Sequence, residues 1–114
     1  MKIIKRSHSE IEKEVAHGGS GARKVYATNN HIKSQYFDAM TYGYLPAGNS
    51  FDWHEHKYIE EIMVVVKGSG AVYDDERDYS YEPGDVFIYP TNTKHKITNN
   101  SDEEHVMMFV RIRV

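Results

Sequence analysis

The sequence predicts a small all-β domain, either a sandwich or a barrel. From residue 24 to the C-terminus, short runs of β-branched and aromatic residues alternate with turn residues. The same region has no apolar periodicity of the kind that marks a long helix. The chain of 114 residues is long enough for one hydrophobic core and too short for two. Many short strands at this spacing are typical of sandwiches and of small barrels, which hide their strand edges.

The N-terminal part of the chain is where we expect a helix. Ser7 and Glu10 have the spacing of a capping box, in which the two side chains bond free backbone donors at the start of a helix. A short helix over 10–16 follows, and the glycine-rich segment 17–21 ends it. That segment lacks the Gly-Lys-Ser/Thr sequence of a phosphate-binding loop. We therefore treat residues 1–23 as an N-terminal helix and loop that precede the barrel.

The remainder of the single domain, 24–114, carries the strands of the barrel. Turn sequences divide it, for example Pro46-Ala47-Gly48 and Pro83-Gly84-Asp85. The segments between the turns are rich in residues that favour strands. The expected strands cover 24–28, 35–45, 51–56, 61–66, 70–73, 78–81, 86–89, 95–98 and 106–114.

Composition excludes several classes of protein. The chain has no cysteine, so it has no thiol nucleophile, thiolate metal site or disulfide. Fourteen Lys and Arg against 17 Asp and Glu give a net charge of -3, without the basic clusters that nucleic-acid binding requires. Its apolar runs are too short for a signal peptide or for the roughly 20 residues that span a bilayer. We expect a cytoplasmic protein that binds a small molecule and neither nucleic acid nor a membrane.

Three histidines and a glutamate are candidate metal ligands. His54 and His56 are two residues apart on an expected strand, so both imidazoles point to the same side. Glu61 opens an apolar run that is predicted to be a central strand, where a carboxylate needs a partner. His95 begins another expected strand. Three imidazoles and one carboxylate form a mixed nitrogen and oxygen site that suits Mn, Fe, Co, Ni, Cu or Zn.

The spacing of these residues resembles the first of two motifs that define the cupin family. That motif is a glycine, five residues, His-x-His, three or four residues, a glutamate, six residues and a glycine. Its fixed positions are filled here by Gly48, His54, His56, Glu61 and Gly68. Glu60 fits the three-residue spacing and Glu61 the four-residue spacing, but only Glu61 has six residues between it and the closing glycine.

The second cupin motif follows after only 15 residues, 69–83, a spacing that resembles the compact microbial members of the family. The motif is a glycine, five residues, Pro-x-Gly, two residues, a histidine, three residues and an asparagine. Asn92 replaces its middle glycine, and because asparagine tolerates left-handed backbone angles we expect the turn to be kept. The motif positions are Gly84, Pro90, Asn92, His95 and Asn99.

The resemblance implies a fold, a cofactor and a range of activities. A cupin is an antiparallel double-stranded β-helix, or jelly-roll barrel. By the motifs, one divalent transition metal is held by His54, His56, Glu61 and His95, with positions left open for other ligands. Such sites serve dioxygenases, decarboxylases, lyases and isomerases in the family, and the fold does not choose among them. We expect a metal-dependent enzyme; the alternative is a protein that binds a sugar or an organic acid without changing it.

Candidate substrate-binding residues lie near the expected ligands. Strand alternation places Met63 and Ile97 on the ligand-bearing faces, where they line the pocket or simply fill the barrel. Arg23 could hold a substrate carboxylate or be solvated. Asp52 could orient a ligand or lie exposed at the start of its strand, and we favour the exposed position. His17 is either a residue of a mobile lid or an exposed loop histidine.

Tyrosines are frequent in this chain, with nine among the 114 residues. Tyr36, Tyr42 and Tyr44 share one face of an expected strand with Asp38, and either line the pocket or form a dimer interface. We favour the interface, and hence a homodimer, because amphipathic aromatic residues are enriched there. The histidines without a partner in the sequence are assigned to the surface: His8, His31 and His105.

Overall fold

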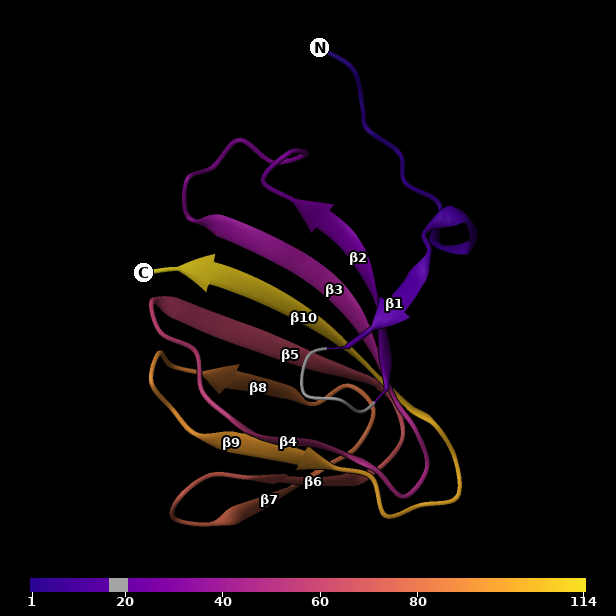
Figure 1. Ribbon diagram of the computed structural model, residues 1–114, viewed down its shortest axis with the longest axis vertical. Helices are drawn as coiled ribbons and strands as arrows, with labels where there is room; N and C mark the ends of the chain where they lie inside the picture. The colour runs from indigo at the N-terminus through magenta and orange to yellow at the C-terminus, as the bar shows by residue number, and fades with distance from the viewer. Residues whose placement is uncertain (17–20) are drawn as a thin grey trace.

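The computed structural model describes residues 1–16 and 21–114, and two antiparallel sheets form most of it (Figure 1). One sheet has six strands in the order β1-β2-β3-β10-β5-β8, and the other has four in the order β4-β9-β6-β7. The two sheets enclose one core, which confirms the all-β jelly-roll barrel. The strands are β1 (Lys13–Val15), β2 (Ala22–Thr28), β3 (Phe37–Leu45), β4 (Ser50–His54), β5 (Ile59–Lys67), β6 (Gly70–Tyr73), β7 (Asp78–Tyr81), β8 (Val86–Tyr89), β9 (His95–Thr98) and β10 (His105–Arg113).

All nine predicted strands are present, and β6, β7, β8 and β9 have the predicted bounds. Turn residues flank each of these four strands closely, so the sequence leaves little freedom in where they begin and end. The other predicted strands differ from the observed ones by one or two residues at their ends. Among the described residues, no helix is long and apolar enough to cross a membrane.

The helix predicted over 10–16 is wrong. Ser7 makes no side-chain cap, and only a 3-10 turn forms, at His8–Glu10. Strand β1 follows it and pairs with β2, where Glu14 Oε1 accepts a hydrogen bond from Arg23 Nε at 2.8 Å. An isolated two-turn helix is marginal in water, whereas pairing with β2 satisfies the backbone groups of this segment. Strands β1 and β2 therefore extend the six-stranded sheet of the barrel, with β2 beginning at Ala22.

The core lies between the two sheets and is filled from both. Its fully buried side chains include Leu45 and Met107 from the larger sheet and Ile97 from the smaller one. Buried and more exposed residues alternate along the middle of β5, as one buried face of a sheet requires. The cupin motif residues Gly48 and Gly84 have positive φ, at 73° and 94°, in the turns that the sequence predicts.

The end of the barrel where β10 begins holds a buried polar cluster around His105. The side chain is 1% exposed, so its assignment to the surface is wrong. Its Nδ1 lies 2.5 Å from the Tyr81 hydroxyl, and its Nε2 lies 3.0 Å from the hydroxyl of Ser101. Tyr81 also donates to the carbonyl of Thr98 at 3.0 Å. Tyr81 belongs to β7, 24 residues away in the sequence, so the sequence around His105 does not reveal this partner.

The predicted face of three tyrosines is divided between the interior and the surface of the chain. Tyr44 is buried, and Tyr42 stacks on Tyr26 with ring centroids 5.3 Å apart. His8 lies edge-on to Tyr42 and bonds the Tyr26 hydroxyl at 2.7 Å. Tyr36 is exposed. Two of the three tyrosines thus have partners within their own chain, and their role in an interface stays a prediction.

Candidate metal centre

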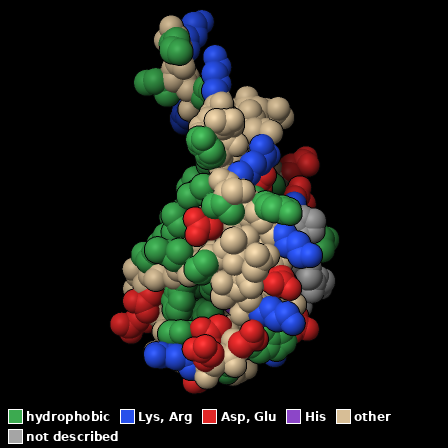
Figure 2. Space-filling view, turned by 90° about the vertical axis from the view of Figure 1, so that its left-hand side faces the viewer, with side chains coloured by type: hydrophobic (Ala, Val, Ile, Leu, Met, Phe, Trp, Pro, Cys, Tyr) green, Lys and Arg blue, Asp and Glu red, His purple; other side chains and the backbone are tan. Residues whose placement is uncertain are grey.

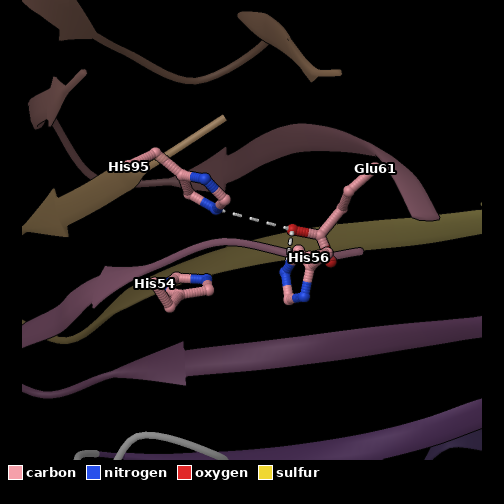
Figure 3. Close-up of side chains that lie close together, drawn as sticks. All are labelled: His54, His56, Glu61 and His95. Carbon is pink, nitrogen blue, oxygen red and sulfur yellow. Dashed lines mark ion pairs between the residues drawn. The ribbon is translucent and has the colours of Figure 1, made fainter. Parts of the chain in front are cut away.

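The four predicted ligands converge at one place inside the barrel (Figure 3). His54 comes from β4, His56 from the loop after it, Glu61 from β5 and His95 from β9. One ligand atom from each side chain lies within 4.8 Å of all the others. Atoms that share an ion at about 2.1 Å lie roughly 3 to 4 Å apart, so a small inward movement would bring all four to one ion. The cluster could therefore hold a metal ion.

Backbone carbonyls fix two of the imidazoles. His54 Nδ1 donates to the carbonyl of Asp52 at 2.6 Å, and His95 Nδ1 donates to the carbonyl of Thr93 at 2.8 Å. Each bond places the proton on Nδ1, so Nε2 carries the free lone pair that a metal requires. A β-bulge in β4 between Phe51 and His54 brings His54 directly opposite His95. The local fold thus sets both the tautomer and the direction of these rings.

His56 lies beyond the end of β4, and the turn of the second motif holds its backbone. The carbonyl of His56 accepts hydrogen bonds from the backbone N–H of Asn92 at 2.8 Å and from the Thr91 hydroxyl at 3.1 Å. Asn92 has φ of 63°, which confirms that asparagine keeps the left-handed turn in place of glycine. One motif therefore positions a candidate ligand of the other.

Two nitrogens in the cluster have no hydrogen-bond partner although they are buried. Among the described residues, the buried side-chain atoms in this condition are Nε2 of His56 and Nε2 of His95. They lie 3.6 and 4.0 Å from the same oxygen, Oε1 of Glu61 (Figure 3). Burial lowers the pKa of His95 to about 4, so this imidazole is neutral at physiological pH. A neutral imidazole beside a buried carboxylate is a donor set that fits a divalent cation.

An aromatic ring supports His95 from the core. Tyr89 stacks on the imidazole with ring centroids 3.9 Å apart and an angle of 10° between the planes. Its hydroxyl contacts the sulfur of Met63 at 3.5 Å. Burial, followed by the nearby charge of Glu61, raises the pKa of Tyr89, so the phenol stays protonated. Tyr89 therefore acts as a rigid, uncharged wall behind the imidazole.

Arg111 is a site residue that the sequence reasoning missed. It stands directly opposite Glu61 in the pairing of β10 with β5, and its Nη1 lies 3.6 Å from Glu61 Oε2. Asp38 holds the same guanidinium, with Oδ2 3.1 Å from Arg111 Nε. Partial burial opposes ionisation of Asp38, but hydrogen bonds from Arg111 and Arg113 keep the pKa of this carboxyl below its usual value. The available signal was strand alternation, which puts Arg111 on the inward face with Met107.

A cavity of about 350 Å³ opens beside the cluster. Of the predicted substrate-binding residues, Arg23 and Ile97 line it, while Met63 is fully buried and belongs to the core. Asp52 is exposed at the cavity, as favoured from the sequence. His17 lies outside the described residues. The wall is mainly apolar, with the arginines and candidate ligands as its charged and polar part: Ala16, Arg23, Thr41, Gly43, Phe51, Asp52, Trp53, His54, His56, Glu61, Ile97, Phe109 and Arg111.

Comparison with known proteins identifies the family. The model of the cupin domain family matches residues 41–111. An uncharacterized protein of Methanocaldococcus jannaschii, MJ1618, is 30% identical over 101 residues, which are 87% of this chain and 78% of that protein.

Solved structures agree with this fold. A Thermotoga maritima protein described as a predicted oxalate decarboxylase superposes with a TM-score of 0.86 at 23% identity, over 98% of this chain and all of that one. The polyketide cyclase RemF from Streptomyces resistomycificus superposes with a TM-score of 0.81 at 17% identity, over 96% of this chain and 80% of that one. At these identities the likeness concerns the fold alone. The family match and the relative in Methanocaldococcus together show that the chain belongs to the cupin family.

Proposed function

We propose that this protein is a metal-dependent enzyme that acts on a small organic molecule. The observation that carries the proposal is the pair of buried imidazole nitrogens, on His56 and His95, that face one oxygen of Glu61 without a hydrogen-bond partner. A buried polar atom left unpaired costs free energy, roughly 1–3 kcal/mol each. A divalent cation would remove that cost by accepting both lone pairs and balancing the carboxylate.

The donor set defines the class of ion. Three imidazoles and one carboxylate, from His54, His56, Glu61 and His95, suit Mn, Fe, Co, Ni, Cu or Zn and leave two positions of an octahedral ion for other ligands. When bound, such an ion polarises an oxygen of a substrate or lowers the pKa of a bound water. The open positions distinguish this site from structural zinc sites, in which protein ligands complete the coordination.

The volume of the cavity, its apolar wall and its arginines restrict which molecules can bind beside the candidate ligands. A volume of about 350 Å³ admits a small molecule only. Phe51, Phe109 and Ile97 form the apolar part of the cavity wall beside the candidate ligands. Arg23 and Arg111 line the same cavity, each oriented by an ion pair, with Glu14 and with Asp38, and offer N–H donors to a carboxylate or another anionic oxygen of a substrate.

The structural neighbours support an enzyme without selecting its reaction. One is described as a predicted oxalate decarboxylase and another as a polyketide cyclase, and the same fold carries both. Function in such a fold depends on the site residues, not on the barrel. The identity of the bound metal and the requirement for oxygen therefore decide the reaction class here.

The first test is metal content, measured by plasma mass spectrometry on untagged protein. We expect about one equivalent of a divalent transition metal in the parent chain, and a strong reduction in His56→Ala and Glu61→Gln. The loaded parent is then incubated with a panel of small organic acids, with and without oxygen, and products are identified by mass spectrometry. Turnover only with oxygen indicates an oxygenase, and anaerobic turnover indicates a lyase, decarboxylase or isomerase.

Two results would contradict the proposal. If the parent binds no metal after reconstitution, the cluster is not a metal centre. If the loaded protein binds an organic acid or sugar in calorimetry but returns it unchanged, the protein is a binding module and not an enzyme.

A further inference from the structure

We propose that Arg111 is a positioning residue that makes Glu61 a one-oxygen ligand and so keeps a coordination position open. This inference rests on the proposed metal centre. The two oxygens of Glu61 face different partners: Oε1 faces the free nitrogens of His56 and His95, at 3.6 and 4.0 Å. Oε2 faces Arg111 Nη1 at 3.6 Å. A carboxylate whose second oxygen is held by a guanidinium does not turn that oxygen toward an ion.

A β-bulge holds the guanidinium in place. Arg111 stands opposite Ala39 and the next residue of β10 stands opposite Phe37, so Asp38 is the extra residue of β3. The bulge directs Asp38 to both arginines, with Oδ2 3.1 Å from Arg111 Nε and Oδ1 3.0 Å from Arg113 Nη2. Arg111 is therefore fixed at one edge of its planar fork, and Nη1 on the other edge lies 3.6 Å from Glu61 Oε2 and 3.5 Å from His56 Nδ1.

The contact between Arg111 and Glu61 determines how many coordination positions of the ion the protein fills. With Glu61 bound through one oxygen, the four candidate ligands fill four of six positions. Without Arg111, Oε2 would be free to bind as well, and the fifth protein donor would displace a water or a substrate atom. Partners of a ligating carboxylate commonly change metal affinity by about 10–100-fold when they are removed.

The chain offers a matched pair of variants. Arg111→Met removes the guanidinium that contacts Glu61 and keeps the length of the side chain. Arg113→Met removes the other guanidinium that pairs with Asp38. Among the described residues, Arg113 has no ion pair with Glu61, so this variant is the control. The readouts are the number of waters on bound Mn(II), measured by electron–nuclear double resonance with labelled water, and the dissociation constant for Mn(II).

We expect Arg111→Met to lose about one water from the ion and to change its Mn(II) dissociation constant by roughly 10-fold or more, while Arg113→Met matches the parent. An Arg111→Met protein with the water count and affinity of the parent would overturn the role of Arg111. If Arg111→Met does not fold, Asp38→Asn tests the same anchor and should give an intermediate loss of bound water; a parent-like count there overturns the proposal. A parent that binds no Mn(II) would instead refute the proposed metal centre.

A separate observation concerns the outer face of the six-stranded sheet. Strand register places apolar side chains side by side in two rows across β3, β10, β5 and β8. The outermost two, Val86 and Ile88, are 58% and 66% exposed. Figure 2 shows a continuous band of hydrophobic side chains down one side of the molecule. The two rows are Tyr42, Met108, Val64 and Val86, and Met40, Val110, Ile62 and Ile88.

We infer that this face binds the same face of a second copy of the chain. Neither row contains a charged residue, and Glu60 stands beyond them on the same side of β5, so the two rows are complementary to themselves in a two-fold dimer and need no oppositely charged partner. Three strands of nine residues and one of four, about 4.8 Å apart, give a face of roughly 490 Å² in projection. The N-terminal arm, with exposed Ile3 and Ile4, extends the apolar surface of each copy toward the about 800 Å² that a stable interface buries.

Sedimentation velocity on the full chain tests this interface. We expect a dimer in the parent, and Ile88→Lys to raise the dimer dissociation constant at least about 100-fold, since a two-fold axis brings the new charge into the interface twice. Ser80→Lys adds the same charge on the exposed side of β7 and should leave the dimer intact. A monomeric parent would overturn the inference. A dimer that survives both Ile88→Lys and Val86→Lys would show that another face is used.

Discussion

The barrel contains two buried histidine clusters, one toward each end of β10, and they differ in how their nitrogens are satisfied. Near the start of the strand, both nitrogens of His105 have partners, in Tyr81 and Ser101. Near its other end, where Arg111 faces Glu61, two imidazole nitrogens in the candidate metal centre have none. The closed cluster is complete within the chain. The open cluster lacks a partner that can accept several lone pairs at once, which is the property of a metal ion.

The presence or absence of hydrogen-bond partners separates structural from functional histidines here. Both His95 and His105 are 1% exposed, and burial lowers the pKa of both imidazoles. Burial and the direction of the pKa shift therefore do not distinguish them. What distinguishes them is the nitrogen without a hydrogen-bond partner: Nε2 of His95 has none, and Nε2 of His56 beside it has none, and both face Glu61.

Metal binding should give the largest effect, and only at the open cluster. At a metal concentration of 1,000 times the dissociation constant, mass action stabilises the folded state by about 4 kcal/mol. We expect this stabilisation in the parent and in His105→Gln, and its loss in Glu61→Gln. Urea unfolding with metal and with chelator measures it. An equal gain in Glu61→Gln would mean that the metal binds elsewhere.

Gly68→Ala should damage the closed cluster alone. Gly68 has φ of 100°, and a Cβ there would collide with the imidazole ring of His105. Backbone strain and overpacking together should lower the free energy of unfolding by about 3 kcal/mol. The metal stoichiometry of the folded fraction should stay at that of the parent. Gly48→Ala is the control for backbone strain, because no atom lies within 4 Å of the added Cβ. Equal losses in the two variants would argue against a collision with His105.

Acid should weaken the closed cluster through His105. Its pKa is lowered by burial, so between the unfolded value of about 6.5 and the folded value the unfolded chain binds more protons. The stability that neutral His105 contributes is therefore present above about pH 6.5 and is lost as the pH falls through the folded pKa. The limiting slope is about 1.4 kcal/mol per pH unit.

The comparison of metal-free parent with His105→Gln isolates this slope, measured by urea unfolding between pH 7.5 and 5. We expect the variant to be less stable at pH 7.5 and to depend less on pH below 6.5. His8→Gln, at an exposed histidine, is the control. Parallel curves for the parent and His105→Gln would remove His105 as the source of the acid sensitivity.

The sequence predicted the open cluster far better than the closed one, for a physical reason. The candidate ligands lie at fixed spacings because short turns position them, as Asn92 does for His56 through a single backbone bond. Of the partners of His105, Ser101 is only four residues away but belongs to no motif, and Tyr81 comes from β7, 24 residues away. Long-range packing of this kind cannot be obtained from one sequence.

The sequence also failed where a β-bulge interrupts the alternation of a strand. The bulge in β4 between Phe51 and His54 breaks the period of two, so alternation does not define the face that Asp52 shares. The bulge in β3 likewise turns Asp38 toward Arg111, although Asp38 was grouped with Tyr36 and Tyr42. A bulge changes the face that later residues occupy, and both bulges lie beside the candidate site, where alternation is therefore a poor guide.

We expect the smallest change in stability from substitutions at Asn92, which, like Gly68, has a left-handed backbone conformation. Gly68 must be glycine because the His105 ring fills the space that a side chain would occupy. Asn92 has a side chain at φ of 63°, and its backbone N–H donates to the carbonyl of His56. We expect Asn92→Gly to change the free energy of unfolding by less than about 0.5 kcal/mol, and Asn92→Ala to lower it by about 1 kcal/mol. Both should bind metal like the parent, since the backbone bond remains. Urea unfolding and metal titration measure the two properties. A loss of metal affinity in Asn92→Gly would show that the asparagine side chain itself positions His56, which would make this turn part of the open cluster and not only its support.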